Sequence, residues 1–385
     1  MRVCVIGCGV IGAALAWRLS ESAANAIVVD SAGPGTGTTA VSFAWANANG
    51  KRPRGYFELN RAGMREYDRV AEELGDASWR HNGGRLATAG HTPEIADLVA
   101  EMSAWGYPAE LLDARRVHRD LEPSVHLGDP DLPVGYFPAE FCVDAVPLTT
   151  ALVRQAARRG ARFQFGTPVT GITPCPAGFT VTLADGTTIT ADAVVNATGP
   201  AASAIGAFAG RPLPMASTRG TTTLVRADNH PVRHIIHTRS LAIRPEGPNH
   251  LRLHVDSHDE ALTTAALATT TRTPGAPATG TLKAGTATPS AADLAEDLSS
   301  RLRTLLPGLI GAHTTATYAG IRPIPADGLT SAGPVPETPG LYEAVTHSGI
   351  TLAPLLARLL ATEITTGKAD PLLKDFRPSR FPTTP

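Results

Sequence analysis

The sequence predicts a two-domain protein of the α/β class, α+β overall, and three observations support this. Within residues 3–30, an apolar strand, a glycine-rich turn, a small-residue helix and a second apolar strand follow one another. Strand-like segments recur between residues 161 and 255, among them a hairpin with alternating apolar positions. The chain has 385 residues, more than one hydrophobic core usually organises. We expect a nucleotide-binding domain and a second domain with a mostly antiparallel sheet.

The first of these segments has the spacing of a Rossmann-like dinucleotide site. The apolar strand Val3–Ile6 leads directly into Gly7, Gly9 and Gly12, and the next strand ends in Asp30. Gly7 permits the tight turn, Gly9 lets the backbone approach the phosphates, and Gly12 brings the helix close to the sheet. The free N–H groups and the positive end of that helix favour a diphosphate. Asp30 is placed to accept hydrogen bonds from the ribose hydroxyls of an adenosine.

Composition argues against several other classes of function. With 34 basic and 35 acidic residues, the net charge of −1 gives no electrostatic support for binding nucleic acid or an anionic membrane. The longest apolar helical stretch, 352–364, is too short to span a bilayer and contains two charged residues. Because the glycine motif begins at once, we expect no signal peptide and a cytoplasmic protein.

Cysteine and histidine spacing predicts no metal site. The four cysteines do not have the spacing of metal ligands. Cys4 and Cys8 fall in the first strand and the glycine turn, where a small buried thiol is expected and a redox pair is the alternative. His250 and His254 flank a strand without a third ligand nearby.

Apolar periodicity and turn residues predict the remaining elements. Phe57–Leu74 has the pattern of an amphipathic helix that ends at Gly75, although Gly63 lies on its apolar face. Residues 80–142 are turn-rich and give no clear assignment. Residues 262–292 consist mostly of Ala, Thr, Gly and Pro, which predicts a surface loop, either a tolerated insertion or a functional lid. The other predicted elements are a helix at 148–156, strands at 161–165, 169–172, 179–183, 193–195, 221–225 and 250–255, a helix at 291–306, a strand-and-turn block at 314–336, a strand at 341–345, and a last helix that ends at Gly367.

Five motifs follow one another in a characteristic order: the glycine turn with Asp30, the loop GTGTTAVSFA, the strand VVNATGP, and the blocks YAGIRPIPADG and THSGITLAP. This order resembles the FAD-dependent D-amino-acid oxidase superfamily, in particular its glycine oxidase and sarcosine oxidase-like members, over nearly the whole chain. The resemblance implies that FAD and a small-molecule amine bind here, and that the C–N bond of an amino acid or secondary amine is oxidised to an imine with O2 as acceptor. It also implies two domains. The FAD-binding domain is discontinuous and consists of residues 1–80, 143–212 and 312–385. The substrate domain consists of residues 81–142 and 213–311.

The resemblance implies which residues hold the cofactor. Thr38, Thr39 and Ser42 fall where related proteins contact the flavin phosphate and ring edge, with ordinary turn residues as the alternative. Val169 stands where relatives read the adenine edge through their backbone, and Ala197–Gly199 resemble the strand end that packs against the dinucleotide. The first turn of the last helix would direct free N–H groups at the flavin and stabilise negative charge on it; its residues are Gly349, Ile350, Thr351 and Leu352.

The resemblance also indicates a substrate site. A guanidinium that grips a carboxylate is the usual way to orient an amino acid, and Arg322 matches the position of this clamp, unless it ties the C-terminal block to the sheet. His347 and Ser348 replace a second arginine of glycine oxidase, so the match to a glycine-specific site is incomplete. His347 would orient the amine, tune the flavin or make a structural hydrogen bond. Arg252 roughly matches an oxygen-activating lysine of sarcosine-oxidase-like proteins, with a solvent-facing strand arginine as the favoured alternative.

Four polar residues beyond the flavin loop are further candidates, either for the substrate entrance or as surface residues: Asn47, Lys51, Arg54 and Tyr56. We expect non-covalent FAD, because no cysteine follows Cys175 and no histidine occurs in residues 34–46. Three alternatives stay open. They are a related dehydrogenase that uses a quinone or another carrier, a flavin-binding protein without amine turnover, and a nicotinamide-dependent dehydrogenase, which would not require the two C-terminal blocks.

Overall fold

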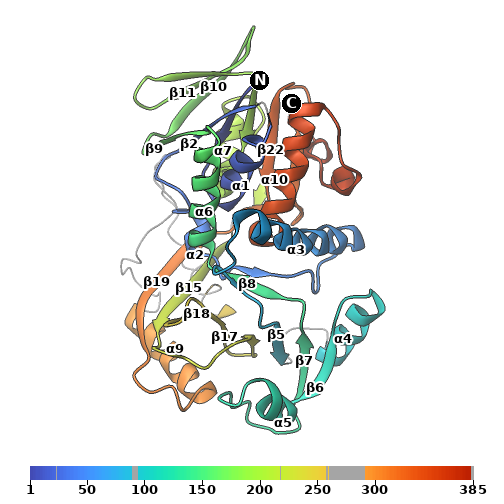
Figure 1. Ribbon diagram of the computed structural model, residues 1–385, viewed down its shortest axis with the longest axis vertical. Coiled ribbons are helices and arrows are strands. Elements are labelled where there is room, and N and C mark those ends of the chain that lie inside the picture. Colours follow the sequence, from blue (N-terminus) through green and yellow to red (C-terminus); the bar gives the residue numbers. More distant parts are fainter. Residues whose placement is uncertain (23, 89–93, 217, 257–258, 260–290, 383–385) are drawn as a thin grey trace.

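Two large β-sheets organise the chain, one in each half of the view in Figure 1. The computed structural model describes residues 1–385 except 23, 89–93, 217, 257–258, 260–290 and 383–385. The surface loop predicted at 262–292 therefore lies almost entirely outside the described residues. The fold class is the predicted one, with a Rossmann-like layer of helices and parallel strands joined to a mostly antiparallel sheet.

The first sheet has six strands in the order β21-β22-β13-β1-β2-β9. Its neighbours are parallel except β21 and β22, which pair antiparallel. The central strand, β1, is apolar and buried on both faces because helices cover one side and a small sheet covers the other. The strands come from three distant parts of the sequence: β1 Arg2–Ile6, β2 Asn25–Asp30, β9 Arg162–Phe165, β13 Ala193–Asn196, β21 Ser331–Pro334 and β22 Leu341–Val345.

Helix α1 (Val10–Leu19) is buried on nearly all sides, since it packs against both α6 (Ala145–Arg158) and α10 (Gly349–Thr366). Its small side chains allow these close approaches. Helix α3 (Arg54–Leu74) packs against α10 in turn. Helices α3 and α10 both end at a left-handed glycine, as predicted, with φ +64° at Gly75 and +74° at the residue after Thr366.

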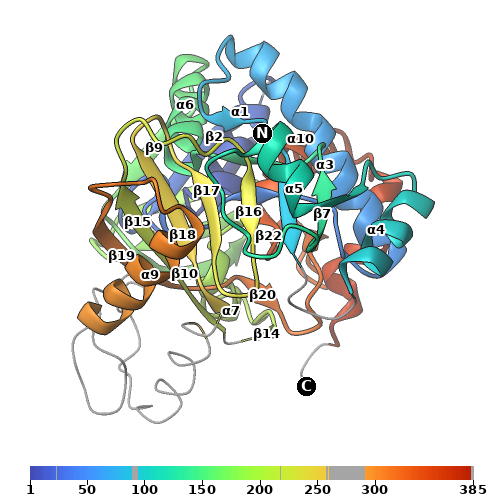
Figure 2. The same ribbon diagram turned by 90° about the horizontal axis from the view of Figure 1, so that it is seen from below.

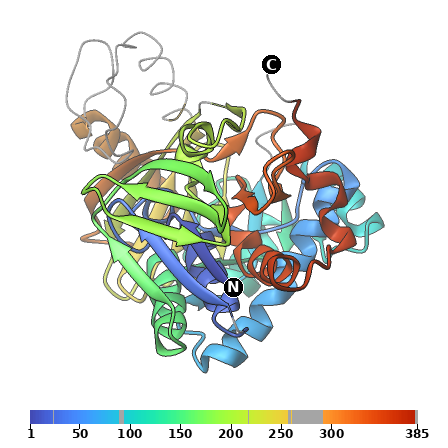
Figure 3. The same cartoon turned by 90° about the horizontal axis from the view of Figure 1, so that it is seen from above.

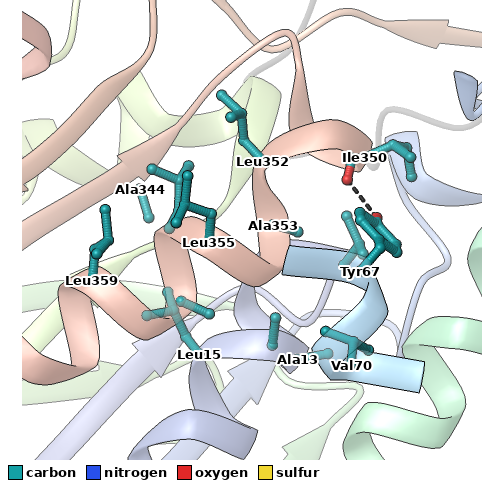
Figure 4. Packing of buried hydrophobic residues seen from close by; sticks show 14 of the residues in the cluster. Ala13, Leu15, Tyr67, Val70, Ala344, Ile350, Leu352, Ala353, Leu355 and Leu359 are labelled. Atoms are coloured by element: carbon teal, nitrogen blue, oxygen red, sulfur yellow. Dashed lines mark hydrogen bonds between the residues drawn. The ribbon is translucent and has the colours of Figure 1, made fainter. Parts of the chain in front are cut away.

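The contact between α3 and α10 explains why a glycine lies on the apolar face of α3. A Cβ on Gly63 would lie 2.5 Å from the carbonyl oxygen of Thr351 and 3.0 Å from Leu352 Cδ2, so only glycine lets the helices come this close. One helical turn later, the Tyr67 hydroxyl donates to the carbonyl of Ile350 at 2.5 Å (Figure 4). Helix α3 thus holds the first turn of α10 in place.

The second sheet has eight strands in the order β19-β15-β18-β17-β16-β5-β7-β6, and all its neighbours are antiparallel except β16 and β5. Helix α9 (Ala291–Leu305) packs along it (Figure 2). Strand β19 (His313–Ile321) was grouped with the FAD-binding segments in the sequence, but it pairs with β15 in this sheet. The other strands are β5 Arg85–Thr88, β6 Glu110–Asp113, β7 Pro133–Phe137, β15 Arg219–Arg226, β16 Ile235–His237, β17 Ala242–Pro245 and β18 His250–His254.

Smaller elements complete the fold. The predicted hairpin turns at 185–186 between β11 and β12, and with β10 it forms a three-stranded sheet over the six-stranded one (Figure 3). Residues 80–142 contribute short strands and one longer helix, α4. No helix in the described ranges combines the length and apolarity of a membrane span. The remaining bounds are α2 Thr38–Val41, β3 Trp45–Ala46, β4 Arg80–His81, α4 Ile95–Ala104, α5 Ala114–Arg116, β8 Phe141–Val143, β10 Val169–Cys175, β11 Gly178–Leu183, β12 Thr188–Ala191, α7 Ala202–Ala207, β14 Met215–Ala216 and β20 Ile324–Pro325.

Candidate active site

A cavity of about 1960 Å³ has walls from both large sheets. On one side it meets the carboxyl ends of the parallel strands, where ligands of doubly wound sheets bind. On the other side it meets β5, β15 and β16 of the eight-stranded sheet. A single drug-sized ligand usually occupies roughly 300–1,000 Å³, so this cavity has room for a dinucleotide together with a second molecule.

The glycine turn forms one end of the cavity and requires its glycines. Gly7 has a φ of +98°, and a Cβ there would lie 2.6 Å from the carbonyl oxygen of Ala197. A Cβ on Gly12 would lie 1.9 Å from the carbonyl oxygen of Gly7. Gly9 is the N-cap of α1 and makes no side-chain cap. The N–H of Val10 donates to Thr39, and the next two N–H groups of the first turn have no intrahelical acceptor and can meet a ligand. This is the cradle expected for a diphosphate.

Asp30 lines the same end of the cavity and also orders the turn. Its carboxylate accepts from the backbone N–H of Cys8 at 2.7 Å, of Ala32 at 2.8 Å and of Gly33 at 3.1 Å. A carboxylate offers about four lone-pair positions, so one remains for a ribose hydroxyl. The ribose contact therefore stays a prediction, and the structure adds a local role that the motif alone did not indicate.

The predicted phosphate and ring-edge residues all line the cavity, but their hydroxyls already have protein partners. Thr38 donates to the carbonyl of Ile321 at 3.0 Å, and Thr39 accepts from the N–H of Val10 at 3.1 Å. Ser42 accepts a local backbone N–H at 2.9 Å. These contacts join α2 to α1 and to the eight-stranded sheet, while unused lone pairs remain available to a ligand. Two further predicted residues also line the cavity, Val169 and Gly199.

The first turn of α10 forms another part of the wall. Gly349, Ile350 and Thr351 line the cavity, and their N–H groups belong to the turn that has no intrahelical acceptors. This helix end therefore presents positive potential to a ligand. Leu352 is an exception to the prediction: its N–H donates to the carbonyl of Ser348 at 2.9 Å, and its side chain is fully buried in the core (Figure 4). It does not line the cavity.

Three basic side chains lie near one another beside this helix end. His347, Lys51 and Arg322 all line the cavity. His347 lines the cavity, and burial followed by the charges of Lys51 and Arg322 lowers its pKa to about 4. His347 is therefore neutral at neutral pH and can accept a hydrogen bond.

Arg322 combines both roles considered from the sequence. Its guanidinium lines the cavity, and it also donates to the carbonyl of Arg219 and to the carboxylate of Asp259. Asp259 is held in turn by the N–H and hydroxyl of Thr221, at 2.6 and 2.9 Å. Gly220 leaves the space that the guanidinium occupies, since a Cβ there would lie 3.0 Å from Cζ of Arg322.

Two of the predicted site residues, Arg252 and Tyr56, lie outside the cavity. Arg252 is only 5% exposed; it makes a two-pronged ion pair with Glu246 and donates to Thr222 at 2.9 Å. The expectation of a solvent-facing arginine was therefore wrong, and no cavity contact supports a role in oxygen activation. Tyr56 is buried, and its hydroxyl is 2.9 Å from Ser348 Oγ, so it acts on the cap of α10.

Of the other proposed entrance residues, some line the cavity and one does not. Asn47 and Lys51 line the cavity, and the backbone N–H of Asn47 donates to the Thr351 hydroxyl at 3.2 Å. Arg54 does not line it; it lies in the first turn of α3 and donates to Glu58 at 2.9 Å. Arg54 is outside the cavity because the chain leaves the cavity wall where α3 begins.

A third acidic or histidine ligand does lie near His254, which corrects the sequence expectation. Ligand atoms of His254, Asp256 and Asp259 lie within 4.8 Å of one another. Burial alone would lower the pKa of His254, but Asp256, Asp259 and the Thr221 carbonyl together raise it. Acceptors at both ring nitrogens, at 2.8 and 3.0 Å, favour a charged imidazole, which is not a metal ligand. Absence of a metal stays a prediction.

The thiols near the glycine turn have no reactive character. Cys4 and Cys8 are buried, and burial raises the pKa of each to about 12, with the charge of Asp30 adding to the shift at Cys8. A thiolate at either position is therefore disfavoured near neutral pH. Their structural role agrees with the sequence expectation.

One cluster on the cavity wall was missed from the sequence. Arg85 Nε donates to Nδ1 of His237 at 2.7 Å, and the guanidinium lies 4.4 Å from the centre of the Trp45 ring. Phe43 stacks on His237 at 5.6 Å. Arg85 falls in the unassigned segment 80–142, and its partners come from distant strands. The sequence feature that could have indicated this cluster is the pair of aromatic residues directly after the flavin loop, Phe43 and Trp45.

Comparison with known proteins identifies the family. The model of the family described as FAD dependent oxidoreductase matches residues 2–363. The chain belongs to this family. Its cofactor is FAD, and the glycine cradle, the two helix ends and the size of the cavity fit that cofactor.

Individual relatives cover nearly the whole length of this oxidoreductase. Glycine oxidase from Bacillus licheniformis is 28% identical over 376 residues, which is 94% of this chain and 92% of the relative. Glycine oxidase from Geobacillus kaustophilus is 27% identical over 371 residues, covering 93% of this chain and 91% of the relative. The crystal structure of glycine oxidase from Geobacillus kaustophilus matches with a TM-score of 0.83 and 25% identity over 99% of both chains.

Proposed function

We propose that this oxidoreductase converts the C–N bond of an amino acid or secondary amine to an imine, with O2 as the final electron acceptor. The observation that carries the proposal is the group of basic side chains, His347, Lys51 and Arg322, beside the first turn of α10 in the cavity. The relatives support it, since those named glycine oxidase act on an amino acid. Bound FAD supplies the acceptor for the hydride equivalent.

The basic side chains would orient a substrate carboxylate. Arg322 uses one of its five N–H donors for Arg219 and one for Asp259, so other donors of the planar guanidinium remain for a ligand. Lys51 lines the same cavity, and its charge is one cause of the lowered pKa of His347, which supports a second positive charge near the same place. A carboxylate held there fixes the position of the adjoining carbon, which is the main requirement of the reaction.

The same charges would also favour the reactive form of the amine. Amine oxidation needs the neutral amine, and positive charges nearby disfavour an ammonium ion. His347 is neutral above about pH 4 because its pKa is lowered to about 4, so it can accept a hydrogen bond from the amine. The N–H groups at the start of α10 present positive potential to charge that develops in the cavity.

The experiment is a comparison of wild type with Arg322→Lys in air, with hydrogen peroxide and the carbonyl product of imine hydrolysis measured together. Lysine keeps the charge but loses the planar fork, so KM for amino acids should rise about 10- to 100-fold while an amine without a carboxylate is unaffected. Equal losses for both substrates would contradict the clamp. If the amine-reduced enzyme persists in air but is reoxidised by a quinone, the electron acceptor is a carrier and not O2.

A further inference from the structure

A second guanidinium faces the cavity on the side of the eight-stranded sheet. Arg85, the first residue of β5, lines the cavity, and its Nε is fixed by Nδ1 of His237. The guanidinium lies against Trp45 at 4.4 Å, so its direction is set by two neighbours. Among the residues that the structure describes, no carboxylate forms an ion pair with it, in contrast to Arg322 and its partner Asp259.

The charge of Arg85 is only partly balanced by the protein. Burial lowers the pKa of its guanidinium, which reflects the cost of keeping this charge away from water. The acid that acts on it most is Glu140, which accepts from Trp45 Nε1 at 2.7 Å and from the Tyr107 hydroxyl at 3.1 Å. Burial raises the pKa of Glu140 to about 7, so this countercharge is incomplete near neutral pH.

The walls around Arg85 suit a ligand with both apolar and anionic parts. Trp45 packs edge-on against His237 at 4.8 Å, and Phe43 stacks on the same ring at 5.6 Å. His237 is neutral, because burial and then the charges of Arg85 and His254 hold its pKa well below the usual range. The group therefore presents one cation among aromatic rings, which is how a buried site recognises a carboxylate on an apolar arm.

We propose that Arg85 binds a second carboxylate of the substrate, remote from the C–N bond that is oxidised. This rests on the proposed amine oxidation and narrows its substrate class. In the sheet, four strands separate β5 from β19, whose end carries Arg322. Five strand spacings of about 4.8 Å put these backbones roughly 24 Å apart along the sheet, so one carboxylate cannot meet both guanidinium groups. The class is amines with two well-separated carboxylates.

The test uses amines that differ only in the remote carboxylate. We would measure anaerobic flavin reduction by N-ethylglycine and N-propylglycine, each against the analogue with a carboxylate at the end of its alkyl group. Wild type should prefer the carboxylated member of at least one pair about 10- to 100-fold. Arg85→Met should abolish the preference and leave the plain N-alkylglycines unchanged, and Arg85→Lys should keep part of it. Arg226→Met is the matched control, because Arg226 is on the same sheet outside the cavity and pairs with Asp228.

Two further readouts separate this proposal from its alternatives. A structural Arg85 would lower the melting temperature when replaced, whereas removing an unpaired buried charge should leave it unchanged or raise it. Equal losses for both members of each pair, or no preference in wild type, would overturn the proposal. If no amine reduces the flavin, amine oxidation fails by itself. In that case glutarate still tests the carboxylate site. It should perturb the flavin spectrum of wild type more than butyrate does, and this difference between the two ligands should disappear in Arg85→Met.

Discussion

Gly63→Ala is the sharpest test of how α3 positions the active site. A Cβ at this position would lie 2.5 Å from the carbonyl oxygen of Thr351, whereas ordinary contacts begin at 3.4 Å. The two helices must therefore separate by roughly 1 Å, and overpacking of this kind costs about 1–3 kcal/mol of folding free energy. Alanine is the better helix former by about 1 kcal/mol, so we expect a net loss of up to about 2 kcal/mol.

The displaced part is the first turn of α10, whose N–H groups line the cavity. We therefore expect weaker FAD binding and slower turnover together with the lower stability, since an error of 1 Å at a reacting centre can cost roughly 100-fold in rate. Urea denaturation and FAD titration measure both effects. Gly55→Ala is the control in the same helix, because its nearest neighbour would be 3.6 Å away, and its stability should be unchanged or higher. A Gly63→Ala protein equal to wild type in both assays would refute the reasoning.

Substitutions at three other positions test separate parts of the structure. Gly12→Ala places a Cβ 1.9 Å from the carbonyl oxygen of Gly7, so the purified variant should retain much less FAD than wild type after gel filtration; full retention would contradict the cradle. Glu140 has its pKa raised from 4.5 to about 7, so up to about 3 kcal/mol of stability should be lost as pH rises through that window. Urea titrations at pH 5 and pH 8 should show that Glu140→Gln abolishes this loss of stability. An unchanged dependence of stability on pH would assign the loss to another group. Glu246→Ala leaves Arg252 buried without its carboxylate, which should cost about 3 kcal/mol, and Glu246→Gln should cost less; equal costs would show that charge is not the cause.

The cofactor end of the site was predictable because its constraints are local in sequence. The turn at Gly7, the close approach at Gly12 and the acid at Asp30 lie within two strands and one helix, so spacing alone carries the geometry. The C-terminal helix was equally readable, since its apolar face and its end at Gly367 follow from residues close together in the chain. The roles of the hydroxyls in the flavin loop were less clear, because their partners belong to distant elements.

The substrate end was not predictable for the opposite reason. Arg85, Trp45 and His237 come from three short strands of two different sheets, and only the tertiary fold brings them together. Arg252 was expected at the surface because a strand arginine usually faces solvent, but the ion pair with Glu246, six residues earlier, makes its burial tolerable. Long-range pairing of this kind leaves no periodic signal in a single sequence.

The most direct test of the central claim is anaerobic titration of the purified, FAD-loaded protein with amino acids and secondary amines, followed by its absorption spectrum. Bleaching of the flavin bands by amines that carry a carboxylate, and recovery of the bands when air is admitted, is the predicted result. A flavin that none of these amines bleaches would contradict amine oxidation, although the conclusions about the fold and the cofactor would still hold.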